Sequence, residues 1–176
     1  MVPESGAGDA LFVLVGGWPA SGKTTLSRAL ARELGTSYLS KDEVKEALMD
    51  RLGAPATVAE SRRLGAAAVA AVLRVAEGCR GAVVDSTWYP YAAPLARRLP
   101  GPIVEVRCRI ERAVAQARFA GRVRDSRHLD DLRSEDELWG VEVDPLGLGP
   151  LIEVDTGAEV DVPALARAVR AAAERR

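Results

Sequence analysis

The chain has 176 residues, of which 48% are hydrophobic and 28% are charged, and its formal net charge at pH 7 is -1. This composition is typical of one globular domain with its own core and excludes a disordered chain, while the nearly neutral charge argues against a general nucleic-acid-binding protein. Its apolar runs are shorter than the roughly 20 residues that cross a bilayer. No basic stretch precedes the apolar Leu11–Val15, and Cys79 and Cys108 are the only cysteines. We therefore expect a cytoplasmic protein without a signal peptide, membrane contact or disulfides.

The first part of the chain predicts two strands separated by a helix. Residues 1–9 are expected to form a flexible N-terminus. The continuous apolar run Leu11–Val15 predicts a strand buried on both faces, and after a loop at Gly16–Ser21 a helix should continue to about Leu34. Ser37–Leu39 predicts the second strand.

Two capping boxes, each a hydroxyl residue followed three positions later by glutamate, predict the starts of the next two helices. Ser40 with Glu43 opens the first helix. Thr57 with Glu60 opens an alanine-rich helix that should end at Gly78.

The rest of the chain continues this alternation. Further elements are predicted as strands at Ala82–Val84, Ile103–Cys108 and Leu151–Val154, a helix at Glu111–Phe119 and a closing helix from Asp161. Strands that alternate with helices are typical of a three-layer α/β domain, so we expect a mostly parallel five-stranded sheet with helices on both faces. No linker or repeat divides the chain, and residues 1–176 are predicted to form a single domain.

Residues 17–24, GWPASGKT, match the phosphate-binding (P-loop) pattern G-x-x-x-x-G-K-[ST] between a predicted strand and a predicted helix. Glycines let backbone N–H groups face phosphates, and the helix N-terminus adds a favourable dipole. In this pattern Lys23 neutralises the β- and γ-phosphates, and the Thr24 hydroxyl is a magnesium ligand. We therefore expect ATP and Mg²⁺ as cofactors, bound through Gly17, Ser21, Gly22, Lys23, Thr24 and Thr25. The alternative is a glycine-rich turn that only joins the strand to the helix.

The sequence also narrows the class of P-loop protein. The chain contains no asparagine, so it lacks the guanine-specific motif Asn-Lys-x-Asp of GTPases. Asp85 ends a predicted strand and is followed by Ser86 and Thr87, whereas motor ATPases usually place a water-activating glutamate there. A compact kinase remains, which would transfer the γ-phosphate of ATP·Mg²⁺ to an alcohol.

Four motifs in order, GWPASGKTT, LSKDEVKEAL, GAVVDSTW and ARFAGRVRDSRH, resemble the AAA_33-type P-loop kinases. These are relatives of the polynucleotide 5′-kinase domain, chloramphenicol phosphotransferase and the zeta-toxin group, and the resemblance runs from about Leu11 to Val169. It implies that Asp42 binds the substrate and accepts the proton of the attacking hydroxyl. It implies that Asp85 binds magnesium or substrate. Lys45, where polynucleotide kinases have arginine, would help to hold the acceptor or the transferred phosphate.

The resemblance also implies an arginine-rich lid at about residues 119–133. It implies that Arg118, just before this segment, and Arg122 close over ATP. The acidic residues nearby in sequence are only Glu111, Asp125, Asp130 and Asp131, and the cluster consists of Arg107, Arg109, Arg112, Arg118, Arg122, Arg124, Arg127 and Arg133. A solvated charged face is the alternative interpretation. His128, inside this segment, is interpreted as a surface side chain.

Several of these residues also have purely structural interpretations. Asp42 lies in the first turn of a predicted helix, where the helix dipole favours a carboxylate. Asp85 is also compatible with a helix N-cap, and Lys45 with a solvated side chain. Trp88 and Tyr89 are interpreted as half-buried packing residues, with the wall of an acceptor pocket as the alternative.

The predicted function is phosphorylation of a hydroxyl on a small molecule, without nucleic acid as a partner. Because Asp42 follows a strand that is expected to neighbour the P-loop strand, its carboxylate should lie beside the γ-phosphate. Two alternatives stay open, a polynucleotide 5′-hydroxyl kinase and a non-catalytic ATP-binding regulatory protein. The resemblance implies that the acceptor binds to the segment at about Lys41–Gly78, which contains too few distinctive polar residues to identify the acceptor.

Overall fold

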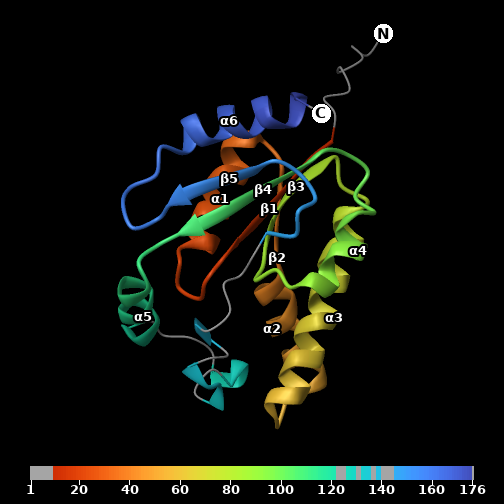
Figure 1. The fold of residues 1–176 in the computed structure, drawn as a ribbon. Coiled ribbons are helices and arrows are strands. Elements are labelled where there is room, and N and C mark those ends of the chain that lie inside the picture. Colours follow the sequence, from red (N-terminus) through yellow and green to blue (C-terminus); the bar gives the residue numbers. More distant parts are fainter. Residues whose placement is uncertain (1–9, 122–125, 130–131, 136–137, 140–144, 176) are drawn as a thin grey trace.

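The computed structural model describes residues 10–121, 126–129, 132–135, 138–139 and 145–175. Within these ranges five strands form one parallel sheet in the order β2-β3-β1-β4-β5 (Figure 1). The strands are β1 (Leu11–Gly17), β2 (Ser37–Ser40), β3 (Gly81–Asp85), β4 (Ile103–Arg109) and β5 (Leu151–Asp155). The helices are α1 (Lys23–Leu34), α2 (Lys41–Leu52), α3 (Val58–Ala76), α4 (Ala93–Ala96), α5 (Arg112–Gly121) and α6 (Val162–Glu174), with short 3₁₀ turns η1 (Pro90–Ala92) and η2 (Ser126–His128). The predicted α/β fold is confirmed, and every strand pairing is parallel.

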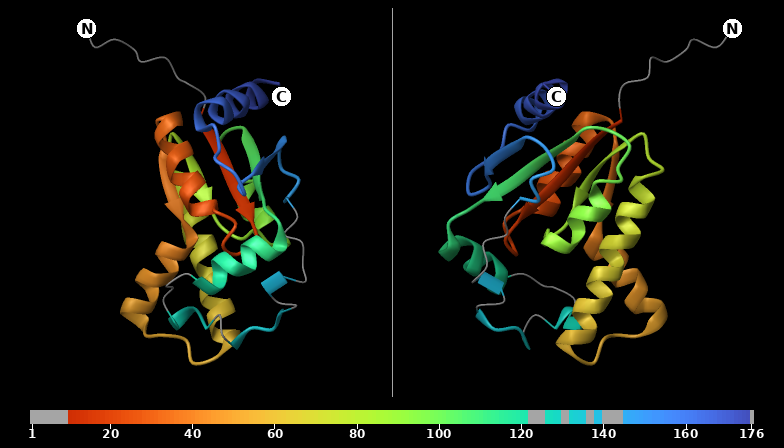
Figure 2. Two further views of the ribbon diagram at one scale, coloured as in Figure 1. Left: turned by 90° about the vertical axis from the view of Figure 1, so that its left-hand side faces the viewer. Right: turned by 45° about the vertical axis from the view of Figure 1, so that its right-hand side comes forward.

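Strand β1 lies at the centre of the sheet, and helices cover both faces of the sheet (Figures 1 and 2). Phe12 and Leu14 pack with α3 and α4 on one face, whereas Val13 and Val15 pack with α1 and α6 on the other. These four side chains are at most 1% exposed. A strand that is buried on both faces needs apolar residues at successive positions, which explains the continuous run in the sequence.

Local capping explains where several helices begin. Ser40 Oγ accepts a hydrogen bond from the backbone N–H of Glu43 at 3.4 Å, and Thr57 Oγ1 accepts one from the N–H of Glu60 at 3.2 Å. Each bond satisfies one of the N–H groups that the first turn of a helix leaves without a partner. None of the helices in the described ranges is long and apolar enough to cross a membrane.

The prediction that β2 neighbours the P-loop strand is wrong, because β3 lies between β2 and β1. In the sheet register Asp85 is aligned with Val15 of β1 on one side and with Ser40 of β2 on the other. The carboxylate that ends β3 is therefore nearest to the P-loop, and Asp42 lies one strand further away.

The carboxyl ends of all five strands meet at one edge of the sheet, since the strands are parallel. The P-loop follows β1 at this edge, α2 follows β2, and α5 follows β4. Figures 1 and 2 show α2, part of α3, α5 and η2 extending beyond this edge. Ligands of open α/β sheets bind outside the carboxyl ends of the strands, so this edge is where a site is expected.

Candidate active site

The P-loop follows a backbone path that requires glycine. Gly17 has φ +141° and Gly22 has φ +85°, and a Cβ added at Gly17 would lie 2.8 Å from the carbonyl oxygen of Cys108. Ala20, between them, also has a positive φ of 56°. The N–H of Ser21 donates to the carbonyl of Trp18 at 3.2 Å and closes the turn before α1. The loop is therefore a tight turn at the N-terminus of α1, a position that suits an anion.

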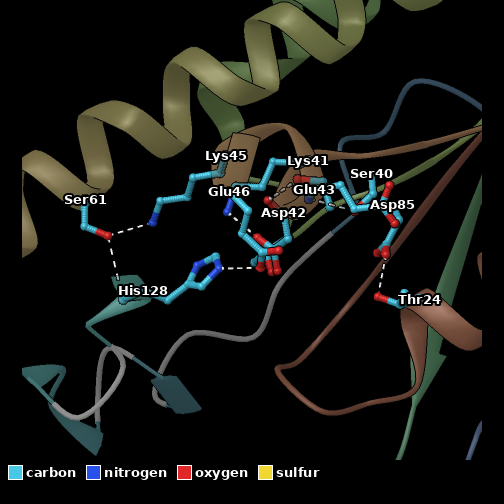
Figure 3. Close-up of polar contacts among 12 residues, drawn as sticks. Thr24, Ser40, Lys41, Asp42, Glu43, Lys45, Glu46, Ser61, Asp85 and His128 are labelled. Atoms are coloured by element: carbon cyan, nitrogen blue, oxygen red, sulfur yellow. Dashed lines mark hydrogen bonds and ion pairs between the residues drawn. The ribbon is translucent and has the colours of Figure 1, made fainter. Parts of the chain in front are cut away.

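Two side chains predicted to bind nucleotide and metal point into the same region. The Lys23 ammonium donates to the carbonyl of Trp18 at 2.6 Å, so it lies back over the loop. The Thr24 hydroxyl donates to Asp85 Oδ2 at 2.6 Å, which joins the end of β3 to the first turn of α1 (Figure 3). Ser21 is fully buried and Thr25 is exposed. The structure thus brings Lys23, Thr24 and Asp85 together.

Asp85 is a buried carboxylate, 5% exposed, at the end of β3. Burial raises its pKa above the ordinary value, the charge of Lys23 and the Thr24 hydrogen bond oppose this shift, and the charge of Asp42 adds to it. The Tyr38 hydroxyl also donates to Asp85 Oδ2, at 3.4 Å. The helix-cap interpretation of Asp85 is wrong, because the next helical turn begins only at Pro90 and has Tyr89 as its N-cap.

The carboxylate of Asp85 and the hydroxyl of Thr24 are the hard oxygen donors that Mg²⁺ prefers. They meet beside the ammonium of Lys23 and the N-terminus of α1, so the residues fit a magnesium-bound nucleotide. Asp42, in the first turn of α2, is about half exposed (49%) and pairs with the Lys41 ammonium at 3.0 Å. Its effect on the pKa of Asp85 places its charge within electrostatic reach of that carboxylate.

Lys45 lies one turn of α2 beyond Asp42, and its interpretation as a solvated side chain is wrong. It is 1% exposed, and its ammonium donates to Ser61 Oγ of α3 at 2.7 Å. The Ser61 hydroxyl in turn donates to the backbone carbonyl of His128 at 3.3 Å (Figure 3). A buried ammonium must be hydrogen-bonded and paired to offset its desolvation, so its position is tightly defined.

The interpretation of His128 as a surface residue is also wrong. It is 1% exposed, and its Nε2 lies 2.8 Å from Glu46 Oε1 of α2. The neighbouring Arg127 pairs with Asp50 of α2 at 2.7 Å. These contacts hold η2 against α2 and α3. The sequence reasoning missed Glu46, although positions 42, 45 and 46 are spaced i, i+3 and i+4 and share one face of a helix.

Only part of the predicted lid falls within the described residues. Arg118 on α5 donates through Nη1 to the carbonyl of Thr156 at 3.1 Å. Thr156 neighbours the end of the P-loop, because a Cβ added at Gly22 would lie 3.6 Å from the Cβ of Thr156. Arg118 is therefore held near this end of the loop. Arg122 lies outside the described residues. Two other arginines pair with acids distant in sequence, Arg112 with Glu135 at 3.4 Å and Arg109 with Glu153 at 3.6 Å.

The aromatic residues after β3 differ in how deeply they are buried. Trp88 is 4% exposed, packs in the core with α3 and α4, and donates from its indole N–H to the carbonyl of Val15 at 3.0 Å. Its interpretation as a half-buried side chain is therefore wrong, and a place in the wall of an acceptor pocket stays a prediction. Tyr89 and Tyr91 are exposed and stack on each other with ring centroids 6.1 Å apart.

The parallel sheet, the glycine loop and the helix that follows it define a P-loop NTPase domain. The AAA_33 family, described as an AAA domain, matches residues 12–136, which is more than half of the chain, and the protein belongs to this family. The family part of the predicted resemblance is confirmed. The closer relation to polynucleotide kinases, chloramphenicol phosphotransferase and zeta toxins stays a prediction. No curated protein matches the sequence.

Solved structures share the fold over nearly the whole chain. A "putative kinase" from Chloroflexus aurantiacus is 30% identical, with 93% of this chain and 95% of that chain covered and a TM-score of 0.74. A gluconokinase from Sinorhizobium meliloti 1021 is 19% identical, with 95% and 93% covered and a TM-score of 0.60. An APS kinase from Mycobacterium tuberculosis, solved with AMPPNP and APS, is 18% identical, with 94% and 98% covered and a TM-score of 0.60. At these identities the last two show similarity of fold alone.

Proposed function

We propose that the protein is a kinase that transfers the γ-phosphate of ATP to a hydroxyl group of a small molecule. The observation that carries the proposal is the arrangement at the carboxyl edge of the sheet. Lys23, Thr24 and Asp85 meet at the P-loop, and the charge of Asp42 is coupled to that of Asp85 from the next strand along. Asp85 thus lies beside the P-loop, and a second carboxylate, that of Asp42, follows the next strand outward, β2.

Each residue has a part that follows from its place. Lys23 and the loop amides would neutralise the phosphates, and the Thr24 hydroxyl and the Asp85 carboxylate would hold Mg²⁺. The metal, when bound, supplies positive charge that stabilises the phosphates during transfer. Arg118, beside Thr156 at the end of the loop, would add a further positive charge. These roles are proposals that rest on geometry and on the chemistry of each side chain.

Asp42 would act on the acceptor. As the acceptor oxygen forms its bond to phosphorus and the bond to the β-phosphate oxygen breaks, a carboxylate oxygen of Asp42 takes the hydroxyl proton. General-base assistance of this kind contributes roughly 10²–10⁴-fold to rate. Asp42 is half exposed and bonded to Lys41, so its carboxylate is accessible from the side of α2.

The acceptor would bind between α2, α3 and η2. In this region Lys45, Glu46, Ser61 and His128 form a continuous set of hydrogen bonds, one helical turn from Asp42 (Figure 3). The Glu46 side chain is 41% exposed and could accept a hydrogen bond from a hydroxyl group of a small molecule, while Lys45, Ser61 and His128 are at most 1% exposed and would hold this surface in place. The kinase names of the structural neighbours support a small acceptor, although those names describe the neighbours.

The proposal is tested with ATP·Mg²⁺ and a panel of hydroxylated compounds, namely sugars, sugar acids, cyclic polyols, nucleosides and amino alcohols. ADP release is followed by a coupled assay, and mass spectrometry detects the phosphorylated product. Lys23→Ala provides the background rate. At least one small alcohol should be phosphorylated well above that background. Preferred phosphorylation of a 5′-hydroxyl oligonucleotide in the same panel would support a polynucleotide kinase, and ATP binding without transfer to any compound would support a regulatory protein.

A further inference from the structure

Three aromatic rings connect the P-loop to α5. Trp18, the second residue of the loop motif, packs edge-to-face on Trp139 with ring centroids 6.3 Å apart and an interplanar angle of 83°. Trp139 packs in the same manner on Phe119 of α5, at 5.5 Å and 78°. Trp139 is 4% exposed. Since edge-to-face pairs are directional as well as apolar, the chain of rings fixes the distance between the loop and the helix.

A second contact joins the same helix to the opposite end of the loop. Arg118, next to Phe119, donates to the carbonyl of Thr156 at 3.1 Å. Thr156 is itself held, because its N–H and its hydroxyl donate to the carbonyl of Arg109 at 2.8 and 3.0 Å. Its Cβ would lie 3.6 Å from a Cβ at Gly22. Consecutive residues of α5 are therefore linked to both ends of the loop through one intermediate residue each, Phe119 through Trp139 and Arg118 through Thr156.

The contact at Trp18 also reaches the lysine of the P-loop. The carbonyl of Trp18 accepts the hydrogen bond of the Lys23 ammonium at 2.6 Å. The position of Trp18 therefore affects the place from which the ammonium, with its three N–H donors, would reach a phosphate, and it affects the shape of the loop.

We propose that Phe119 and Trp139 are positioning residues for the nucleotide, which act through Trp18 on the P-loop and through α5 on Arg118. The proposal rests on the ATP-binding part of the proposed function and does not require a known acceptor. It goes beyond the P-loop pattern, because positions 119 and 139 lie outside that motif and Trp18 occupies a position that the motif leaves variable.

The test measures the affinity of AMPPNP·Mg²⁺ by calorimetry for Phe119→Leu and Trp139→Leu, with Val114→Ala as a matched control on an exposed part of the same helix. Phe119→Leu removes one aromatic pair and should weaken binding by roughly 3–10-fold. Trp139→Leu removes two pairs and should weaken it at least as much, whereas the control should stay within about 2-fold. Trp139→Phe keeps an aromatic ring and should retain most of the affinity. Melting temperatures establish that each variant is folded.

A double-mutant cycle separates positioning from general stability. If Phe119 acts through Arg118, then Phe119→Leu should weaken binding much less in an Arg118→Ala background than in the wild type. Wild-type affinity in folded Phe119→Leu and Trp139→Leu would overturn the proposal, and fully additive losses with Arg118→Ala would overturn the route through Arg118. Lys23→Ala is included to keep the two proposals apart. Undiminished AMPPNP·Mg²⁺ binding by Lys23→Ala would refute the nucleotide site. If Lys23→Ala loses binding but Phe119→Leu and Trp139→Leu bind as tightly as the wild type, only the positioning role is refuted.

Discussion

Replacing Asp85 by asparagine should stabilise the protein without ligand and weaken its binding of magnesium-bound nucleotide. Asparagine keeps the shape of the side chain and can still accept the hydrogen bond from Thr24, which is 2.6 Å away in the wild type. The substitution removes a carboxylate whose pKa is raised mainly by burial, even though Lys23 and Thr24 favour its charged form. The net upward shift means that desolvation outweighs those favourable interactions, so the neutral side chain is better accommodated.

The dependence on pH has a definite sign. A carboxyl group whose pKa is raised by folding contributes stability that is fully present below its unfolded pKa and is lost as pH rises through the folded pKa. At pH 7 the wild type should therefore have a lower melting temperature than Asp85→Asn. The difference between the two melting temperatures should shrink as the pH falls toward about 4, where an unperturbed aspartate titrates. Asp161→Asn, a change at the N-cap of α6, is the control and should show no such difference.

The effect on binding can be measured by the same melting assay. At a ligand concentration about 100 times its Kd, binding adds about 2.7 kcal/mol, or about 5–11 °C for a domain of this size. Loss of an outer-shell partner of a metal typically weakens metal binding by 10–100-fold, so loss of a direct carboxylate ligand should cost at least ~10-fold. At the same AMPPNP·Mg²⁺ concentration the variant should gain only about 1.4 kcal/mol, or about 3–6 °C. An equal gain in both proteins would refute the metal role of Asp85.

Further predictions concern other parts of the site. Lys23→Ala should abolish AMPPNP·Mg²⁺ binding in calorimetry while the circular dichroism spectrum stays unchanged, because its ammonium lies over the loop and outside the core. Asp42→Asn should lower kcat at least ~10²-fold on an acceptor found by the panel, with ATP affinity changed less than a few-fold, and near wild-type turnover would leave Asp42 as a helix-terminus residue. Gly17→Ala should destabilise the fold and prevent nucleotide binding, as seen by melting with and without AMPPNP, because its Cβ would lie 2.8 Å from a backbone oxygen. Binding to a single-stranded oligonucleotide should be weak, and tight, steeply salt-dependent binding in a titration would contradict this.

Patterns within short segments predicted much of the fold. The strand, loop and helix of residues 11–34 are contiguous in sequence. The apolar run, the glycines and the helix pattern could therefore be interpreted together, and the structure has β1 and α1 in this segment. Ser40 and Thr57 cap the helices for which their capping boxes were identified. These features depend on neighbours within a few positions, and local sequence contains that information.

The surroundings of the site needed the folded chain. His128 was interpreted as a surface side chain, and solvation was an alternative for Lys45, yet both are buried. The partners of His128 are far from it in sequence, Ser61 by 67 positions and Glu46 by 82. Nothing in a local charge pattern indicates that two polar segments pack against each other. The ring contact between Trp18 and Trp139 is likewise a contact between distant segments.

The sequence by itself determined that a phosphate-binding loop lies between a buried strand and a helix, and that carboxylates follow two other strands. Only the tertiary structure decided which carboxylate lies next to the loop. The order β2-β3-β1 places Asp85 beside Thr24 and moves Asp42 one strand outward, toward α3 and η2. Strand order depends on how the helices pack across both faces of the sheet, and the hydrophobic pattern of a strand is the same whichever parallel neighbour it has.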